Sequence, residues 1–190
     1  MEQVKWKETD VIYYSSRKYL DQNEHCKLYK IDHTWGSIQN HIHDYFQIWF
    51  VKKGEFMHAI ENQPLYKMVK GNIFLIPPYT MHRVEIEAGG IFEIIGCEFM
   101  PEAITEHQPG IESSYNISML SYLKPFWMEV KQLKPKIPLI GKSDKWAETM
   151  LEEMFAEFAA KPPFYNVYLK GCLLQLFPCW VKERLAPCRK

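Results

Sequence analysis

A regular succession of short apolar or alternating runs, from about residue 10 to residue 100, constrains the fold more than any other feature of the chain. Breaks rich in glycine, proline or polar residues separate these runs, which read CKLYKI, FQIWFVKK, FMHAI, YKMVKGNIFLI, HRVEIEA and IFEIIGCEF. We expect Gly54 to end the second run, and Pro77 to end the fourth because proline cannot donate to a β-ladder. Strands this short and evenly spaced are typical of antiparallel barrels and sandwiches. We therefore predict a mainly β fold, an antiparallel β-barrel over residues 1–105.

The periodicity changes after the barrel. Residues 106–142 are predicted to form an irregular connecting segment, because prolines exclude long elements from it. In residues 143–190, apolar residues recur at three-four spacing, which predicts a C-terminal α-helical hairpin. Ser143 or Asp144 is the expected N-cap of its first helix, and Pro178 is expected to kink or end the second.

The two predicted helices are rich in Met, Phe, Leu and Trp. Part of this apolar surface must pack on the barrel, but it exceeds what one small barrel needs to cover. Antiparallel pairing of helices from two subunits would bury the remainder. We predict a homodimer formed through the C-terminal helices.

Charge and cysteine content exclude several classes of protein. Lys plus Arg equals Asp plus Glu, at 23 each, so there is no basic excess and we expect no DNA contact by this chain alone. The N-terminus lacks a signal-peptide core, and no apolar run approaches the length of a membrane span. Five scattered cysteines without a CxxC pair do not fit a disulfide framework. The expected location is the cytoplasm, without membrane association.

Residues 41–55, which read HIHDYFQIWFVKKGE, contain the most informative spacing in the chain. Side chains two apart on a strand point the same way, so His41 and His43 should project from one face. Gln47 and Trp49 share their parity and should line the interior. The residues between them are also apolar, so this strand should be buried on both faces.

Two blocks of the sequence form a pattern. The first is HxHxxxQ at residues 41–47, followed by Gly54, and the second is GxxxxxP at residues 71–77, followed by His82. Together they resemble the cupin superfamily, jelly-roll barrels whose usual metal set is three histidines and a glutamate. That resemblance places His41, His43 and His82 at the histidine positions and Gln47 at the glutamate position. It implies a possible divalent metal (Zn, Ni, Fe or Mn) on the three histidines, since imidazole suits such ions. Gln47 offers only a neutral carbonyl oxygen and an amide donor, which favours an organic ligand.

The string from His41 to His82 is similar, more narrowly, to the N-terminal effector-binding and dimerisation domain of AraC-type transcriptional regulators. The resemblance implies a barrel that binds a small-molecule effector, a sugar or another small polar or aromatic metabolite. It also implies helices that pair two subunits. Members of that family carry a DNA-binding helix-turn-helix domain that is absent from this chain, which we expect to be either a truncated sensor domain or a stand-alone relative.

Several other side chains are candidates with two interpretations each. Trp35 and Tyr79 lie in loops next to the two blocks and either stack on an effector or cap the core. His58 either joins the histidines or faces solvent. For Glu98, which shares parity with Ile94, we expect an exposed position rather than an inward one.

The sequence is compatible with three functional hypotheses. The leading hypothesis is an effector-sensing and dimerisation domain whose ligand contacts His41, His43, Gln47, His82, Trp35 and Tyr79. The second is a metal-dependent cupin enzyme, a dioxygenase or isomerase, that uses the three-histidine site. The third is a dimerisation module whose barrel is filled by side chains and binds nothing.

Overall fold

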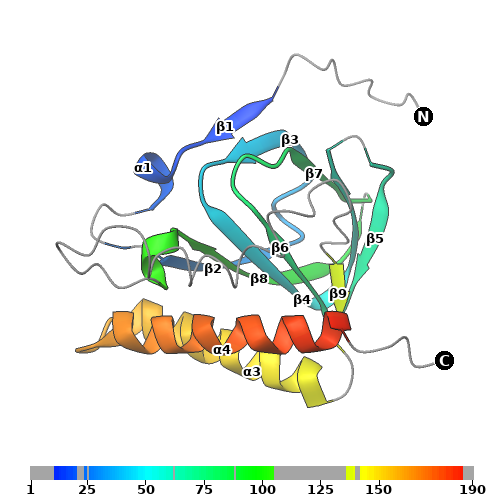
Figure 1. Ribbon diagram of the computed structural model, residues 1–190. Coiled ribbons are helices and arrows are strands. Elements are labelled where there is room, and N and C mark those ends of the chain that lie inside the picture. The colour runs from blue at the N-terminus through cyan, green and yellow to red at the C-terminus, as the bar shows by residue number, and fades with distance from the viewer. Residues whose placement is uncertain are drawn as a thin grey trace.

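Two β-sheets face each other and enclose the interior of a barrel, and a pair of helices covers one of them from outside (Figure 1). This is a computed structural model. It describes residues 11–20, 24, 26–61, 63–87, 89–104, 136–139 and 142–185. Two short helices, α1 (Ser16–Tyr19) and η1 (Pro101–Ala103), accompany the barrel.

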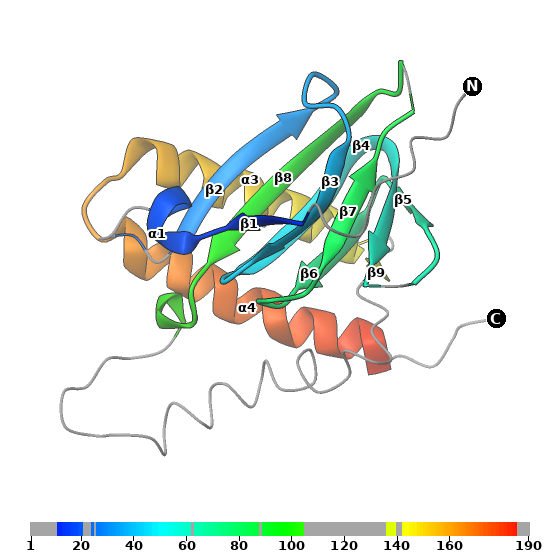
Figure 2. The same ribbon diagram turned by 90° about the horizontal axis from the view of Figure 1, so that it is seen from above.

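The first sheet lies away from the long helices (Figure 1), and seen from above it lies in front of them (Figure 2). Its outermost strand, β1, pairs in parallel with β3, and the other pairs are antiparallel. In spatial order it consists of β1 (Ile12–Tyr14), β3 (Ile38–His43), β7 (His82–Glu85), the second half of β4 (Phe46–Ile60) and β5 (Tyr66–Val69).

The second sheet is antiparallel and carries the helices. In spatial order it consists of β2 (Cys26–Asp32), β8 (Phe92–Phe99), the first half of β4, β6 (Asn72–Ile76) and β9 (Lys136–Pro138). Strand β9 comes from the predicted connecting segment, of which residues 106–135 lie outside the described residues. A proline can end β9 because an edge strand does not need every N–H for pairing.

Strand β4 runs without interruption through both sheets, so the prediction that Gly54 ends a strand is wrong. Gly54 has φ +72°, and a Cβ there would lie 1.7 Å from the carbonyl oxygen of Ile91. The pairing of β4 with β8 shifts register between Val51 and Lys53. Such a glycine bends the strand and turns its second half into the other sheet.

The first half of β4 is buried on both faces, as predicted. Trp49 belongs to the apolar cluster inside the barrel, with Phe74 beside it. Ile48 and Phe50 point the other way, into the cluster beneath the helices. This part of the chain therefore forms a wall between the barrel interior and the helical layer.

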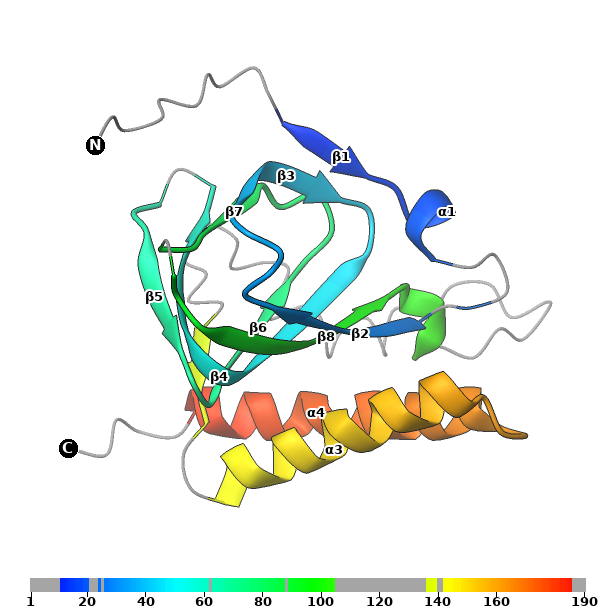
Figure 3. The same ribbon diagram turned by 180° about the vertical axis from the view of Figure 1, so that it is seen from behind.

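Helices α3 (Lys142–Ala160) and α4 (Tyr165–Leu185) lie side by side against the second sheet (Figures 1 and 3). Their inward side chains are buried, and each large aliphatic one stabilises the fold by about 1.5–3 kcal/mol relative to exposure. These side chains are Ala147, Met150, Leu151, Met154, Leu169, Cys172, Leu173 and Leu176.

The helix boundaries differ slightly from those predicted. Because α3 begins at Lys142, Ser143 and Asp144 lie in its first turn rather than at the N-cap, where an acidic side chain still complements the helix dipole. Helix α4 continues through Pro178 instead of ending there. Proline removes only one backbone hydrogen bond, and the turns on either side maintain the helix.

The predicted architecture, a mainly β antiparallel barrel followed by a helical hairpin, is confirmed. None of the helices in the described part of the chain is long and apolar enough to cross a bilayer.

Candidate functional site

The structure brings the histidines of the two sequence blocks together inside the barrel. His41 and His43 lie on β3 and His82 on the neighbouring strand β7, where His41 and His82 are register partners. The ring centroids of His41 and His82 are 3.9 Å apart, and those of His43 and His82 are 5.0 Å apart. All three side chains are buried.

His58 is a fourth member of this cluster. It lies on the second half of β4, and its ring centroid is 5.6 Å from that of His82. Its Nδ1 is 2.5 Å from the hydroxyl oxygen of Tyr66, and its side chain is buried. Of the two positions considered for His58, the structure therefore shows the inward one.

Burial keeps these imidazoles neutral. Desolvation lowers the pKa of His43 to about 4 and that of His58 to about 3. It also lowers the pKa of His41, and that of His82 well below the usual value. The cluster thus adds four polar rings to the interior but no positive charge at neutral pH.

Each Nδ1 of the three motif histidines faces a backbone carbonyl oxygen. The distances are 2.8 Å from His41 to Gln39, 2.6 Å from His43 to Tyr45 and 3.0 Å from His82 to Thr80. With hydrogen on Nδ1, the rings of His41 and His43 would donate to those carbonyls and present Nε2, the tautomer that metal-bound histidines commonly use. The Nε2 of His82 faces the amide oxygen of Gln47, so a hydrogen on that nitrogen would donate to Gln47.

The remaining geometry does not fit a metal centre. The Nε2 of His82 lies 3.2 Å from Oε1 of Gln47, so the position of the usual cupin carboxylate is taken by a neutral amide oxygen, a weaker metal ligand. In the described part of the chain, no three His, Cys, Asp or Glu side chains form a group that could hold a metal ion. The metal set implied by the cupin resemblance is thus not assembled by His41, His43 and His82.

Gln47 connects the histidines to a buried carboxylate. Its amide nitrogen lies 3.3 Å from Oε1 of Glu98, and the hydroxyl of Tyr29 donates to the same oxygen at 3.0 Å. Glu98 is only 8% exposed, so the expectation of an exposed position is wrong. Its strand β8 is covered by the helices on one face and by the barrel interior on the other, and Glu98 points inward.

Two further aromatic side chains complete this network. The indole N–H of Trp49 donates to the hydroxyl of Tyr29 at 2.7 Å. The hydroxyl of Tyr45 hydrogen bonds with Glu98. Burial raises the pKa of Glu98, while the hydrogen bonds from Tyr29, Gln47 and Tyr45 act in the opposite direction by favouring the carboxylate.

A pocket of about 240 Å³ opens beside this network. Aromatic side chains dominate its wall, and His41, Gln47 and Glu98 supply polar groups. The lining consists of Tyr14, Tyr19, Lys27, Tyr29, Ile31, Trp35, Ile38, His41, Tyr45, Gln47, Trp49 and Glu98.

The six predicted ligand-binding residues take different places relative to this pocket. His41, Gln47 and Trp35 line it, and Trp35 is 60% exposed. His43 and His82 pack behind His41 and do not line it. Tyr79 is 68% exposed and is not among the lining residues either.

Sequence reasoning missed the tyrosines of the pocket. For Tyr29, the sequence feature that could have indicated the site is Gly96 within an otherwise apolar strand. Tyr29 of β2 is the register partner of Gly96 on β8, and a Cβ at Gly96 would lie 2.4 Å from the tyrosine ring. A glycine opposite an aromatic residue makes room for the ring to lie over the strand. Tyr14 and Tyr19 come from the N-terminal segment, whose docking no local pattern indicates.

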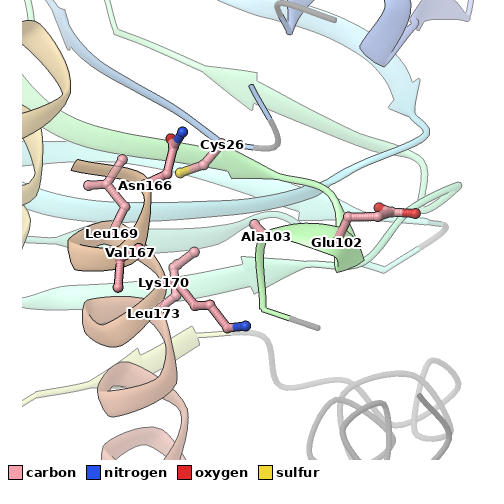
Figure 4. A pocket seen from close by; sticks show the side chains of 8 residues that line it. All are labelled: Cys26, Glu102, Ala103, Asn166, Val167, Leu169, Lys170 and Leu173. Carbon is pink, nitrogen blue, oxygen red and sulfur yellow. The ribbon is translucent and has the colours of Figure 1, made fainter. Parts of the chain in front are cut away.

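A second pocket, of about 200 Å³, lies outside the barrel between α4, η1 and β2. Figure 4 shows η1, with Ala103 and Glu102, beside the α4 side chains Asn166 and Lys170, and the Glu102 side chain points away from α4. It contains no histidine and is separate from the hydrogen-bond network, so we place the candidate site in the barrel pocket.

Comparison with known families now identifies the domain. The family model described as AraC-like ligand binding domain matches residues 26–129, more than half of the chain. The chain belongs to this AraC-like family. The matched range begins at β2 and includes the barrel pocket apart from Tyr14 and Tyr19, and it confirms the family resemblance predicted from the sequence.

One curated relative of this AraC-like domain is YbfI of Bacillus subtilis strain 168, named an uncharacterized HTH-type transcriptional regulator. The two are 25% identical over 136 residues, which cover 72% of this chain and 49% of that protein. The chain thus spans about half the length of the curated relative that it matches.

Among solved structures, the AraC-like domain is similar to cupins. An RmlC-like cupin with a double-stranded β-helix fold from Methanocaldococcus jannaschii is 19% identical, covers 40% of this chain and 72% of its own, and gives a TM-score of 0.37. A cupin superfamily protein from Desulfitobacterium hafniense is 12% identical, covers 42% and 72%, and gives a TM-score of 0.36.

Proposed function

We propose that this domain is the effector sensor of a transcriptional regulator that works in the cytoplasm and binds a small organic molecule in the barrel pocket. The single observation that carries the proposal is the pocket itself. Ring faces line its wall, while a connected set of polar groups lies at Gln47 and Glu98. Concave, mostly apolar sites with a few fixed polar groups are typical of small-molecule binding.

The packing of β4 supports a route from the pocket to the helices. Gln47 and Trp49 face the pocket, and their neighbours Ile48 and Phe50 pack beneath α3 and α4. An effector that binds one arrangement of this wall better than another would shift the population of helix positions. The position of the helices would then depend on whether the pocket holds an effector, and the other parts of a regulator could respond to that position.

Intrinsic fluorescence offers a direct test, because Trp35 and Trp49 line the pocket. We would titrate a panel of sugars, aromatic acids and amines and follow both emission and thermal stability. At least one member should change both, and Gln47→Leu should abolish or strongly weaken that change. Gln63→Leu, in the turn after β4 and outside the pocket, is the matched control. A panel without any hit, or a hit that Gln47→Leu leaves intact, would contradict the proposal.

We also propose that two copies pair through α4. Phe164 and Val167, just before and within its first turn, are 81% and 67% exposed, and Tyr168 continues the same stripe. Gly171 follows one turn later, and a Cβ there would meet nothing within 4 Å, so a second helix could approach closely. Apolar side chains exposed at this spacing are typical of a helix that pairs with a partner.

Sedimentation would test this pairing. Val167→Asp places a charge on the stripe and should yield monomers at concentrations where the unaltered chain is dimeric. Ile91→Asp introduces the same charge at an exposed site on the barrel and should leave the dimer intact. A monomeric unaltered chain, or a Val167→Asp variant that remains dimeric, would contradict the α4 interface.

The metal-dependent enzyme is not favoured as an alternative. Gln47 supplies a neutral oxygen where the usual cupin set has a carboxylate, and no three His, Cys, Asp or Glu side chains of the described residues form a group that could hold a metal ion.

A further inference from the structure

We propose that the effector of the barrel pocket is a small organic cation, an amine whose ammonium group binds Glu98 within an aromatic enclosure. This rests on the proposed function, because it names the chemical class of ligand for the same pocket. Three observations lead to it: the sign of the buried charge, the direction of the hydrogen bonds and the nature of the wall.

The first observation is the charge of the pocket. Among the described residues, Glu98 is the only acidic side chain in the lining, and it is more than nine-tenths buried. No lysine or arginine of the described part of the chain forms an ion pair with it. His41 is the only imidazole that these residues contribute to the lining, and it is neutral because burial lowers its pKa. A buried carboxylate without a partner cation is costly, and a cationic ligand would remove that cost.

Lys27 is the one lysine or arginine that the described residues contribute to the lining, and its ammonium group is directed away from Glu98. It is the register partner of Glu98 across β2 and β8. Its Nζ nevertheless donates to the backbone carbonyl of Tyr19 at 3.1 Å. Lys27 therefore lowers the pKa of Glu98 only through space and leaves the carboxylate accessible to another cation.

The second observation is the direction of the hydrogen bonds. Tyr29, Gln47 and Tyr45 all donate to Glu98. Trp49 uses its only N–H on Tyr29. These donors are thus used within the network, and what these four residues and Glu98 offer a ligand is acceptor capacity on the carboxylate and hydroxyl oxygens. A ligand that donates hydrogen bonds fits this inventory, whereas an anion would meet a buried negative group.

The third observation is the wall. Six aromatic rings line one pocket: Tyr14, Tyr19, Tyr29, Trp35, Tyr45 and Trp49. The face of an aromatic ring attracts a cation, and enclosures of such rings are used to bind ammonium groups. A buried carboxylate among these rings adds a full charge of the sign that an amine requires.

Isothermal titration with three probes of similar size tests the charge preference: benzylamine, benzyl alcohol and benzoate. Benzylamine should bind most tightly. Glu98→Gln should weaken its binding by about tenfold or more, because a hydrogen bond between charged groups is lost. The same substitution should leave the affinity for benzyl alcohol unchanged. Glu55→Gln, which removes an exposed carboxylate paired with Lys67, is the control and should have no effect.

A second variant keeps the proposal testable if Glu98→Gln fails to fold. Trp35 is largely exposed, so Trp35→Ala should fold normally while weakening benzylamine about three- to tenfold by removing one ring face. Tyr79→Ala removes an exposed ring that does not line the pocket and should leave binding unchanged.

Three results would overturn the amine assignment: no binding of benzylamine, tighter binding of benzyl alcohol or benzoate, or equal benzylamine affinity in wild type, Glu98→Gln and Trp35→Ala. If a sugar or aromatic acid from the wider panel still binds in a Gln47-dependent manner, only the amine assignment fails. If nothing in that panel binds, the sensor function fails with it.

Discussion

Acidification should destabilise this fold strongly, because its histidines are buried as neutral rings. An imidazole in the unfolded chain has a pKa of about 6.5. In the folded chain, burial lowers the pKa of His43 to about 4 and that of His58 to about 3. Between those values the unfolded state binds protons that the folded state does not. Stability is therefore present above the unfolded pKa and is lost as the pH falls toward the folded pKa.

The size of the effect follows from the same values. Each of the two rings contributes up to about 1.4 kcal/mol per pH unit within this window. Integration from about pH 7 to about pH 5 gives a loss of about 3–4 kcal/mol for His43 and His58 together. Glu98 acts with the opposite sign, because its raised pKa means that the folded state retains the proton more tightly, and it offsets part of the loss. Domains of this kind have about 5–15 kcal/mol of stability in total, so the effect should be large.

Urea unfolding at a series of pH values would measure this slope. His58→Phe fills the same space without a titrating group and should reduce the slope between about pH 5 and pH 7 by roughly 1 kcal/mol per pH unit on average. A free energy of unfolding that does not change over this range, or an undiminished slope in His58→Phe, would refute the buried neutral cluster.

Other substitutions test the packing around the pocket. Gly54→Ala should cost more than about 4 kcal/mol of stability, because its Cβ would overlap a backbone carbonyl oxygen, whereas Gly89→Ala, which also has positive φ but open space, should cost about 1 kcal/mol in the same denaturant titration. Gly96→Ala should displace the ring of Tyr29 and weaken effector binding in a fluorescence titration more than it lowers the melting temperature. Leu173→Ala should lower the free energy of unfolding by about 2–5 kcal/mol by opening a cavity beneath the helices.

The meeting of the histidines was predictable, but the full site was not. A period of two places His41 and His43 on one face, and the cupin resemblance brings His82 beside them. The inward position of Glu98 is different, because its strand is apolar at nearly every position and is buried on both faces. Periodicity then cannot say which parity faces the pocket. The packing of the helices on one face of the sheet determines which alternate residues of β8 face the pocket.

The role of Gly54 illustrates a related limit. A glycine between two apolar runs is compatible with a turn or with a bend in one continuous strand. The choice depends on the close approach of the backbone at Ile91, which lies far away in sequence. Strand β9 was missed for a similar reason, because a short edge strand next to prolines has no periodicity of its own and exists through pairing with β6.

The wall formed by β4 is a single layer of backbone, with ring and amide groups on one surface and aliphatic groups on the reverse. A molecule in the pocket and the helices on the other side are therefore separated by one strand layer and the side chains on its two faces. A ligand that displaces the backbone of β4 would therefore act directly on the helices packed against its other face. Substitutions that move the backbone of β4 to reshape the pocket would therefore also move the surface on which the helices pack.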